Sequence, residues 1–141
     1  ANPEALIAQA NVLFWHDWKF AEAERQFSRA LEANPSYAAA HHDYGWLLVA
    51  TGRTEDGLAS LRRALRTGGH LWLTVPGPRS GLDAVERDEG GRLFRDLPAE
   101  PLIALCRENR LRELSRWDEP DRLGRMDIRW RGCLLEAVGT R

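Results

Sequence analysis

The sequence predicts an α+β protein in which two antiparallel helical hairpins precede a small three-stranded mixed β-sheet with one or two helices. Three observations lead to this class. Residues 4–67 have apolar side chains at helical spacing and almost no β-branched residues. The same segment repeats itself with a period of 34 residues. After Gly68-Gly69 the chain changes to prolines, glycines and short apolar runs, which are typical of strands.

Each 34-residue repeat is expected to form a helix, a turn and a second helix. The first repeat predicts helices at about 4–17 and 20–33, and the second predicts helices at about 37–50 and 54–67. Pro35 separates the repeats, because proline disfavours helical backbone angles in the residue before it.

Aligning the repeats identifies the expected core of the hairpins. Small residues that suit close helix approach recur at the same positions, but Gly57 stands where the first repeat has Ala23. Glycine inside a helix costs about 1 kcal/mol relative to alanine, so we expect Gly57 to weaken its helix. Four bulky side chains are expected to be buried between the paired helices: Phe27, Leu31, Leu61 and Leu65.

This period, with its pattern of small and bulky residues, resembles the tetratricopeptide repeat over about residues 4–69. Asn11 and Gly45 occupy the usual glycine site of that family, whereas Trp18 stands where its turn normally has glycine. Proteins of this family bind other proteins against the inner face formed by the first helix of each repeat. The resemblance therefore implies a non-catalytic interaction or scaffold module with a protein or peptide partner.

The resemblance also assigns partner-binding residues to that inner face. Aromatic side chains dominate such contacts, so we expect an apolar peptide to bind there. Family variants that bind acidic tails carry Lys and Asn at these places, and this chain has neither. An alternative stays open, in which the tryptophans pack against the chain's own second half. The predicted partner-binding residues are Val12, Trp15, His16, His42, Trp46 and Val49.

The second half begins with the run "LASLRRALRTGGHLWLTV", which ends at Val75. It predicts a helix that passes through a Gly-Gly turn into a strand at 71–75, which Pro76 ends. The elements predicted after it are a helix at about 98–109 and strands at 111–117 and 128–137.

This order of elements resembles the closing half of the class I S-adenosylmethionine-dependent methyltransferases, over residues 58–138. The resemblance implies a partial Rossmann-like unit, with the last strand between the other two and antiparallel to both. The helix at 54–66 fits both patterns. We therefore expect two domains, 1–67 and 68–141, which share that helix.

The residues that would complete a methyltransferase are absent from the pattern. No Gly-x-Gly-x-Gly run follows a strand, and no acid ends a second parallel strand. We therefore predict no catalytic and no cofactor-binding residue, no cofactor, and a protein that is not an enzyme. Two alternatives stay open: a methyltransferase relative that needs a partner to supply its cofactor half, and an engineered or recombinant chimera without native function.

Other features indicate few further roles. Adjacent residues on a helix point about 100° apart, so His41 and His42 cannot share one metal ion; we assign both to a solvated helix face and predict no metal site. Cys106 is interpreted as a small core residue, and a disulfide with Cys133 is not expected. The net charge of −1 and the lack of a long apolar stretch predict a cytoplasmic protein that binds neither nucleic acid nor membrane.

The strand Leu71–Val75 is apolar and uncharged, and it is expected at a sheet edge, where it needs a cover. Soluble proteins normally cover such an edge. A repeat helix, the loop from Pro76 to Leu97, or the same strand of a second copy would each do so. We favour the second copy, which predicts a two-fold homodimer through this strand.

Overall fold

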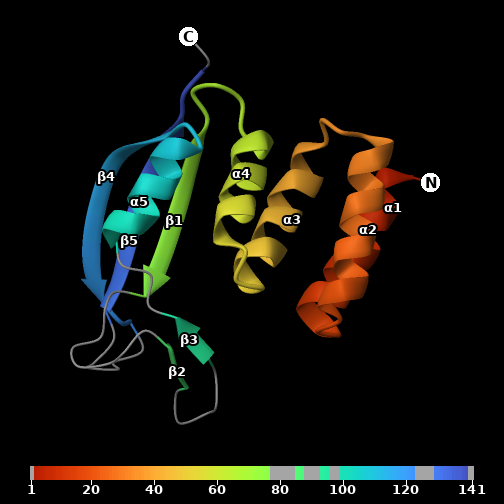
Figure 1. The fold of residues 1–141 in the computed structure, drawn as a ribbon, viewed down its shortest axis with the longest axis horizontal. Helices are drawn as coiled ribbons and strands as arrows, with labels where there is room; N and C mark the ends of the chain where they lie inside the picture. The colour runs from red at the N-terminus through yellow and green to blue at the C-terminus, as the bar shows by residue number, and fades with distance from the viewer. Residues whose placement is uncertain (1, 77–84, 88–92, 96–98, 123–128, 140–141) are drawn as a thin grey trace. The chain divides into compact units, whose positions relative to one another are not determined.

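The structure, a computed structural model, divides into two compact units, Ala1–Arg66 and Thr67–Arg141 (Figure 1). Each unit has its own buried apolar side chains. That the two predicted domains share the helix at 54–66 stays a prediction. Five stretches of the chain are described: residues 2–76, 85–87, 93–95, 99–122 and 129–139.

The first unit consists of two helical hairpins, as predicted (Figure 1). Helix α1 (Pro3–Asn11) continues into a π-helical turn, η1 (Val12–His16), and α2 (Phe20–Ala33) follows it. Helices α3 (Ala38–Ala50) and α4 (Thr54–Ala64) form the second hairpin. The π turn differs from the prediction, which expected one uninterrupted α-helix up to residue 17.

Local sequence explains where these helices begin and end. The side chain of Asn2 accepts a hydrogen bond of 2.9 Å from the backbone N–H of Glu4 and so caps α1. Helix α2 ends because Asn34 has extended backbone angles (φ −144°, ψ 91°) in front of Pro35. The turn between α3 and α4 contains Gly52 at φ +86°, a left-handed conformation that favours glycine.

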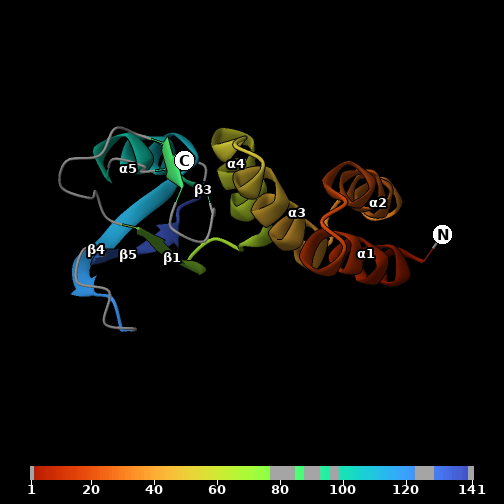
Figure 2. The ribbon, with the colours of Figure 1, turned by 90° about the horizontal axis from the view of Figure 1, so that it is seen from below.

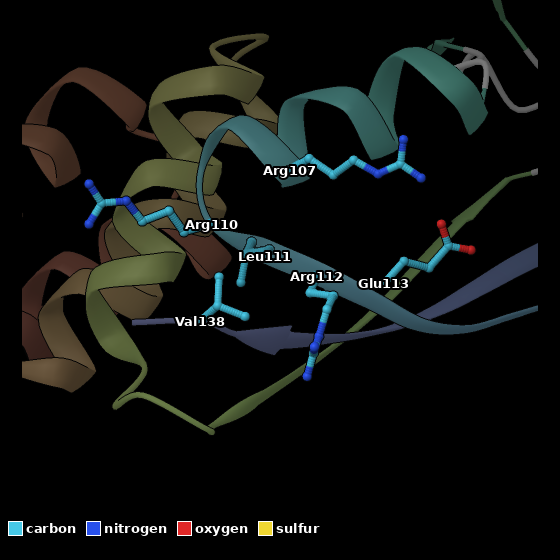
Figure 3. A pocket seen from close by; sticks show the side chains of 6 residues that line it. All are labelled: Arg107, Arg110, Leu111, Arg112, Glu113 and Val138. Atoms are coloured by element: carbon cyan, nitrogen blue, oxygen red, sulfur yellow. The ribbon is translucent and has the colours of Figure 1, made fainter. Parts of the chain in front are cut away.

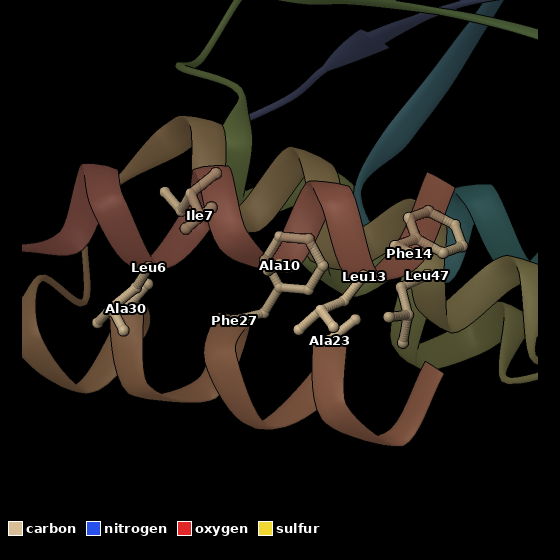
Figure 4. Packing of buried hydrophobic residues seen from close by; sticks show 10 residues of the cluster. Leu6, Ile7, Ala10, Leu13, Phe14, Ala23, Phe27, Ala30 and Leu47 are labelled. Carbon is tan, nitrogen blue, oxygen red and sulfur yellow. The ribbon is translucent and has the colours of Figure 1, made fainter. Parts of the chain in front are cut away.

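The core of the first unit lies between the helices of each hairpin, and Phe27 projects into it from α2 (Figure 4). Phe27 and Leu61 are fully buried, as predicted. The predicted burial of the other two leucines is only partly correct. Leu31 packs at the margin of the cluster, and Leu65 is half-buried because α4 ends before it and its backbone is extended.

Helices α3 and α4 approach each other closely at two glycines. A Cβ atom on Gly57 would lie 2.6 Å from Cγ2 of Val49 and 2.9 Å from the carbonyl oxygen of Gly45. A Cβ atom on Gly45 would lie 2.7 Å from Cγ of Leu61. We therefore expect alanine at position 57 to destabilise the protein, the reverse of what helix propensity predicts, because Val49 and the backbone of α3 occupy the space that a methyl group needs.

The second unit contains a three-stranded sheet of β1 (His70–Pro76), β4 (Leu111–Pro120) and β5 (Arg129–Ala137). The strand order is β1-β5-β4, which confirms that the last strand lies in the middle. Both pairings are antiparallel, so the sheet is antiparallel throughout and not mixed. Helix α5 (Ala99–Glu108) lies over one face of the sheet (Figure 2).

A second, two-stranded sheet was not predicted. Strands β2 (Val85–Arg87) and β3 (Leu93–Arg95) pair in antiparallel fashion. Three residues per strand are too short to show a readable alternation of apolar and polar side chains. The rest of the predicted loop from Pro76 to Leu97 lies outside the described residues, and so does part of the loop after β4.

The two faces of the three-stranded sheet differ. Trp72 projects from β1 on the face opposite to Leu71 and Leu73, is largely exposed, and meets the ring of Trp117 edge-to-face at 5.0 Å. The buried side chains of the second unit come from alternate strand positions and from α5, and they are Leu71, Leu73, Leu102, Ile103, Cys106, Leu111, Cys133, Leu135 and Ala137. None of the helices in the described ranges is both long enough and apolar enough to span a bilayer.

Cys106 and Cys133 are buried free thiols. Burial, with smaller contributions from the neighbouring Cys133 and Glu113, raises the pKa of the Cys106 thiol to about 12. Because the thiolate is the reactive species, we expect negligible labelling of native protein by a disulfide reagent at pH 8 and rapid labelling of both thiols in denaturant. Rapid labelling of Cys106 without denaturant would contradict the buried placement.

Candidate functional site

An apolar pocket of ≈ 350 Å³ opens in the first unit, where α1 and η1 turn into α2 beside the end of α3. Pockets of this size and character are typical of ligand and peptide sites. Every side chain that lines it is apolar or aromatic: Phe14, Trp15, Trp18, Phe20, Trp46, Val49 and Ala50.

The backbone around this pocket is irregular. The N–H of Asp17 donates to the carbonyl of Val12 at 3.1 Å, five residues back, which is the π-helical spacing. The N–H of Lys19 donates to the carbonyl of Leu13 at 2.8 Å. Such π turns add a residue to the helix and occur frequently at functional sites. Here the turn changes the direction of the side chains that follow Val12.

Trp18 has a φ of +58°, in the left-handed region that follows a helix end and is usually occupied by glycine. Gly52 holds the equivalent position of the second repeat at φ +86°. A side chain with a Cβ atom costs about 1–2 kcal/mol in this conformation. The indole of Trp18 is also 72% exposed, so burial does not offset that cost.

One buried and one partly buried aromatic ring contact the exposed tryptophans. Phe14 is buried and lies 4.3 Å from Trp15 and 5.9 Å from Phe20, measured between ring centroids. Phe20 in turn meets Trp18 edge-to-face at 6.1 Å. Trp15 is 63% exposed despite these contacts. Large aromatic side chains clustered at the surface mark interaction sites more often than isolated ones do.

Trp46, on the α3 side of the pocket, is held by a short hydrogen-bond chain. Its Nε1–H donates to Nε2 of His42 at 3.1 Å, and Nδ1 of His42 lies 2.8 Å from Oδ1 of Asp43. Because a carboxylate only accepts, His42 carries its proton on Nδ1 and accepts at Nε2. Asn11 donates to Oδ2 of Asp43 at 2.7 Å and so ties α1 to α3.

The pocket brings together three of the six side chains that the sequence predicted for partner binding, namely Trp15, Trp46 and Val49. His42 supports Trp46 from outside the lining. Val12 and His16 are exposed but do not line the pocket. The role of all six in binding a partner stays a prediction.

Three aromatic lining residues were not among the predicted binding residues: Phe14, Trp18 and Phe20. The repeat pattern assigned neither Phe14 nor Phe20 to the inner face, and it left Trp18 as a departure from the turn pattern. The available signal was the density of aromatic residues in the run from Phe14 to Phe20, which a helix–turn–helix segment does not need for its own packing.

A second pocket of the first unit, of ≈ 250 Å³, is lined by side chains whose hydrogen bonds hold the helices together. His41 is buried, so its assignment to a solvated face was wrong; its Nε2–H donates to the carbonyl of Pro35 at 2.9 Å. Ser60 donates to the carbonyl of His41 at 2.9 Å. The hydroxyl of Tyr44 donates to Glu24. Burial, and to a smaller extent this hydrogen bond, raises the pKa of Tyr44. These bonds join helices α2, α3 and α4.

A third pocket, of ≈ 310 Å³, lies where α5 turns into β4 (Figure 3). The guanidinium groups of Arg107, Arg110 and Arg112 point in different directions, so they do not converge on one anion. Arg112 pairs with Glu136. Across the described stretches of the chain, no three His, Cys, Asp or Glu side chains are grouped to hold a metal ion.

The fold and the pocket define a helical-repeat unit followed by a small antiparallel α+β unit. The sequence model of the tetratricopeptide repeat family matches residues 17–69. This segment, which contains α2, α3 and α4, is tetratricopeptide-repeat sequence, as predicted. Helix α1 and the π turn precede the matched residues.

The methyltransferase resemblance of the second part is confirmed at the level of fold. Among solved structures, the chain is similar to 1,6-didemethyltoxoflavin-N1-methyltransferase of Burkholderia thailandensis, a structure that holds 1,6-didemethyltoxoflavin and S-adenosylhomocysteine. The TM-score is 0.51 at 16% identity, over 62% of this chain and 38% of the enzyme. The chain therefore spans well under half of that enzyme. No curated protein sequence matches the chain.

Proposed function

We propose that this protein is an interaction module that binds an apolar segment of a protein or peptide partner in the aromatic pocket. Two findings support the proposal. Residues 17–69 are tetratricopeptide-repeat sequence, and such repeats generally mediate contacts between proteins. The pocket also presents two largely exposed tryptophans, Trp15 and Trp18, and aromatic anchors carry most of the energy of such contacts.

The single observation that carries the proposal is the conformation of Trp18. Its backbone is strained and its ring is exposed, so the residue costs folding energy without a compensating burial. Backbone strain of this kind concentrates at functional sites. The second repeat has Gly52 at the same position and avoids the cost. An indole held at the mouth of an apolar pocket is suited to contact a partner.

A displayed library of random peptides, selected against the whole chain, tests the proposal. We expect the recovered peptides to contain aromatic or aliphatic anchors and to bind the Trp46→Ala variant roughly tenfold or more weakly. Affinity is measured by fluorescence anisotropy, and circular dichroism checks that the variant is folded. Recovery of no peptide, or equal affinity for both proteins, would overturn the proposed site.

Replacing Trp18 by glycine separates a binding role from a folding role. Relief of the left-handed strain opposes the entropy that glycine loses on folding, so stability should change by no more than about 1 kcal/mol. Affinity for a selected peptide should fall roughly tenfold. Arg110→Gly is the matched control, since Arg110 has φ +57°, belongs to the second unit and does not line this pocket. It should relieve similar strain and leave the affinity unchanged.

A second candidate function is supported by the likeness of fold to a methyltransferase. Such a protein would act with a partner that supplies the missing cofactor half. Calorimetric titration of the chain with S-adenosylmethionine distinguishes the candidates. We expect no heat of binding; a saturable heat release would favour the enzyme relative.

The edge-strand homodimer also stays a prediction. Within the described part of the chain, strand β1 pairs with β5 on one side and lies at the edge of its sheet. Lysine at Leu73 would be a poor test, because Leu73 is buried and the change would disrupt the core. Thr74 is exposed and pairs with Gly132, so Thr74→Lys charges the strand without entering the core. Light scattering should give the mass of a dimer for the wild type and half that mass for Thr74→Lys. A wild-type mass of one chain at every concentration would contradict the homodimer.

A further inference from the structure

The pocket is lined mainly by side chains of η1 and α3, which carry no lysine or arginine, and Phe20 comes from α2, which carries Arg25 and Arg29. Neither α1, η1 nor α3 contains a lysine or an arginine, and their ionised residues are Glu4 and Asp43. The arginines of the first unit lie instead on α2, on α4 and at the turns. A partner segment with acidic side chains would therefore meet no lysine or arginine on α1, η1 or α3.

Two carboxylates lie next to the tryptophans of the pocket. Asp17 stands in the turn between Trp15 and Trp18, and Asp43 precedes Trp46 by three residues, close to one helical turn. Each accepts a hydrogen bond from the preceding histidine, at 2.7 Å for Asp17 and 2.8 Å for Asp43. Lys19, at the start of α2, is a single cation against these two anions.

Asp17 is the carboxylate better placed to meet a partner. Asp43 uses its second oxygen to hold Asn11, whereas Asp17 has no hydrogen bond at Oδ2 within the described ranges. The Asp17 side chain is 33% exposed. The exposed indoles on either side of it also attract cations through their ring faces. Asp17 therefore combines a carboxylate oxygen without a described hydrogen bond with two exposed indoles that flank it in the sequence, and carboxylates and indole faces both attract cations.

We propose, building on the peptide-binding function above, that the pocket selects a segment in which an apolar anchor stands next to lysine or arginine. The anchor fills the space bounded by Phe14, Trp46 and Val49. The adjacent cation meets Asp17 and the ring faces of Trp15 and Trp18. An acidic neighbour to the anchor would be repelled by the same carboxylate and would gain no partner from α1 or α3.

Three fluorescein-labelled peptides test this selectivity. They share a central Leu-Phe anchor and differ only in the two residues on each side, which are lysine, glutamine or glutamate. At low salt we expect the lysine peptide to bind at least about fivefold more tightly than the glutamate peptide. The difference should shrink at high salt, because screening weakens exposed charge pairs.

The outcomes separate the two proposals. Equal affinities for the three peptides, all weakened by Trp46→Ala, would overturn the charge selectivity and support the peptide site. Failure of all three peptides to bind would overturn the peptide site itself. Asp17→Asn should bring the ratio of lysine to glutamate affinity close to one. Glu4→Gln, an equal change of charge at the far end of α1, should leave that ratio as in the wild type.

Discussion

Replacing Phe27 by alanine should destabilise the helical unit by about 3–5 kcal/mol, the largest effect expected of any single substitution in it. Phe27 has no exposed surface and lies in the cluster that joins α1, α2 and α3. Its ring also packs against Tyr44, with centroids 5.9 Å apart. The substitution removes these contacts and leaves a cavity between three helices.

Urea unfolding followed by circular dichroism at a helix-sensitive wavelength measures this loss. Arg25→Ala is the matched control, because Arg25 is on the same helix and exposed, and it should change the midpoint little. A Phe27→Ala protein that unfolds at the wild-type midpoint would show that the register of the repeat is wrong.

Replacing Gly57 by alanine should destabilise the protein by about 1–3 kcal/mol, although alanine is the better helix former. The new Cβ atom would lie within 3 Å of both Val49 and the Gly45 carbonyl, so α3 and α4 must move apart. Helix propensity alone predicts the opposite sign, a gain of about 1 kcal/mol. The sign of the measured change therefore decides between local propensity and helix contact.

A double-mutant cycle locates the strain. Val49→Ala removes Cγ2, the atom closest to the new methyl group, at 2.6 Å. In the double variant, Val49→Ala should restore part of the unfolding free energy that Gly57→Ala removes. The stability changes of the two substitutions should therefore not be additive. Recovery should be incomplete, because the Gly45 carbonyl oxygen, at 2.9 Å, remains. Additive effects, or a Gly57→Ala protein more stable than the wild type, would contradict the close helix contact.

The helices and main strands were predictable because their signals are local. Apolar residues at 3.6-residue spacing located α2 and α4, the 34-residue repeat located α3, and Pro35 and Gly52 marked the ends of α2 and α3. Alternation and chain order, together with the methyltransferase resemblance, located β1, β4 and β5 and the central place of the last strand. The same reasoning overestimated the length of α4, whose end depends on the turn into β1 rather than on periodicity.

The candidate site was predicted only in part, because a pocket depends on where side chains from different elements point. The repeat pattern placed Trp15, Trp46 and Val49 on one face. It assumed a regular first helix, so it could not foresee the π turn that presents Phe14 and Trp18 to the same space. A π turn adds one residue within a helix, and no periodicity of so short a segment identifies it.

The sequence by itself determined the elements, their order and the repeat class, because periodicity and helix ends depend on neighbours a few residues apart. Only the tertiary structure decided the role of Gly57, the burial of His41 and the strain at Trp18. The first two depend on how closely α3 meets its neighbours, and the third on the backbone path out of η1. These are properties of packed elements in three dimensions, which the pattern of one chain segment does not contain.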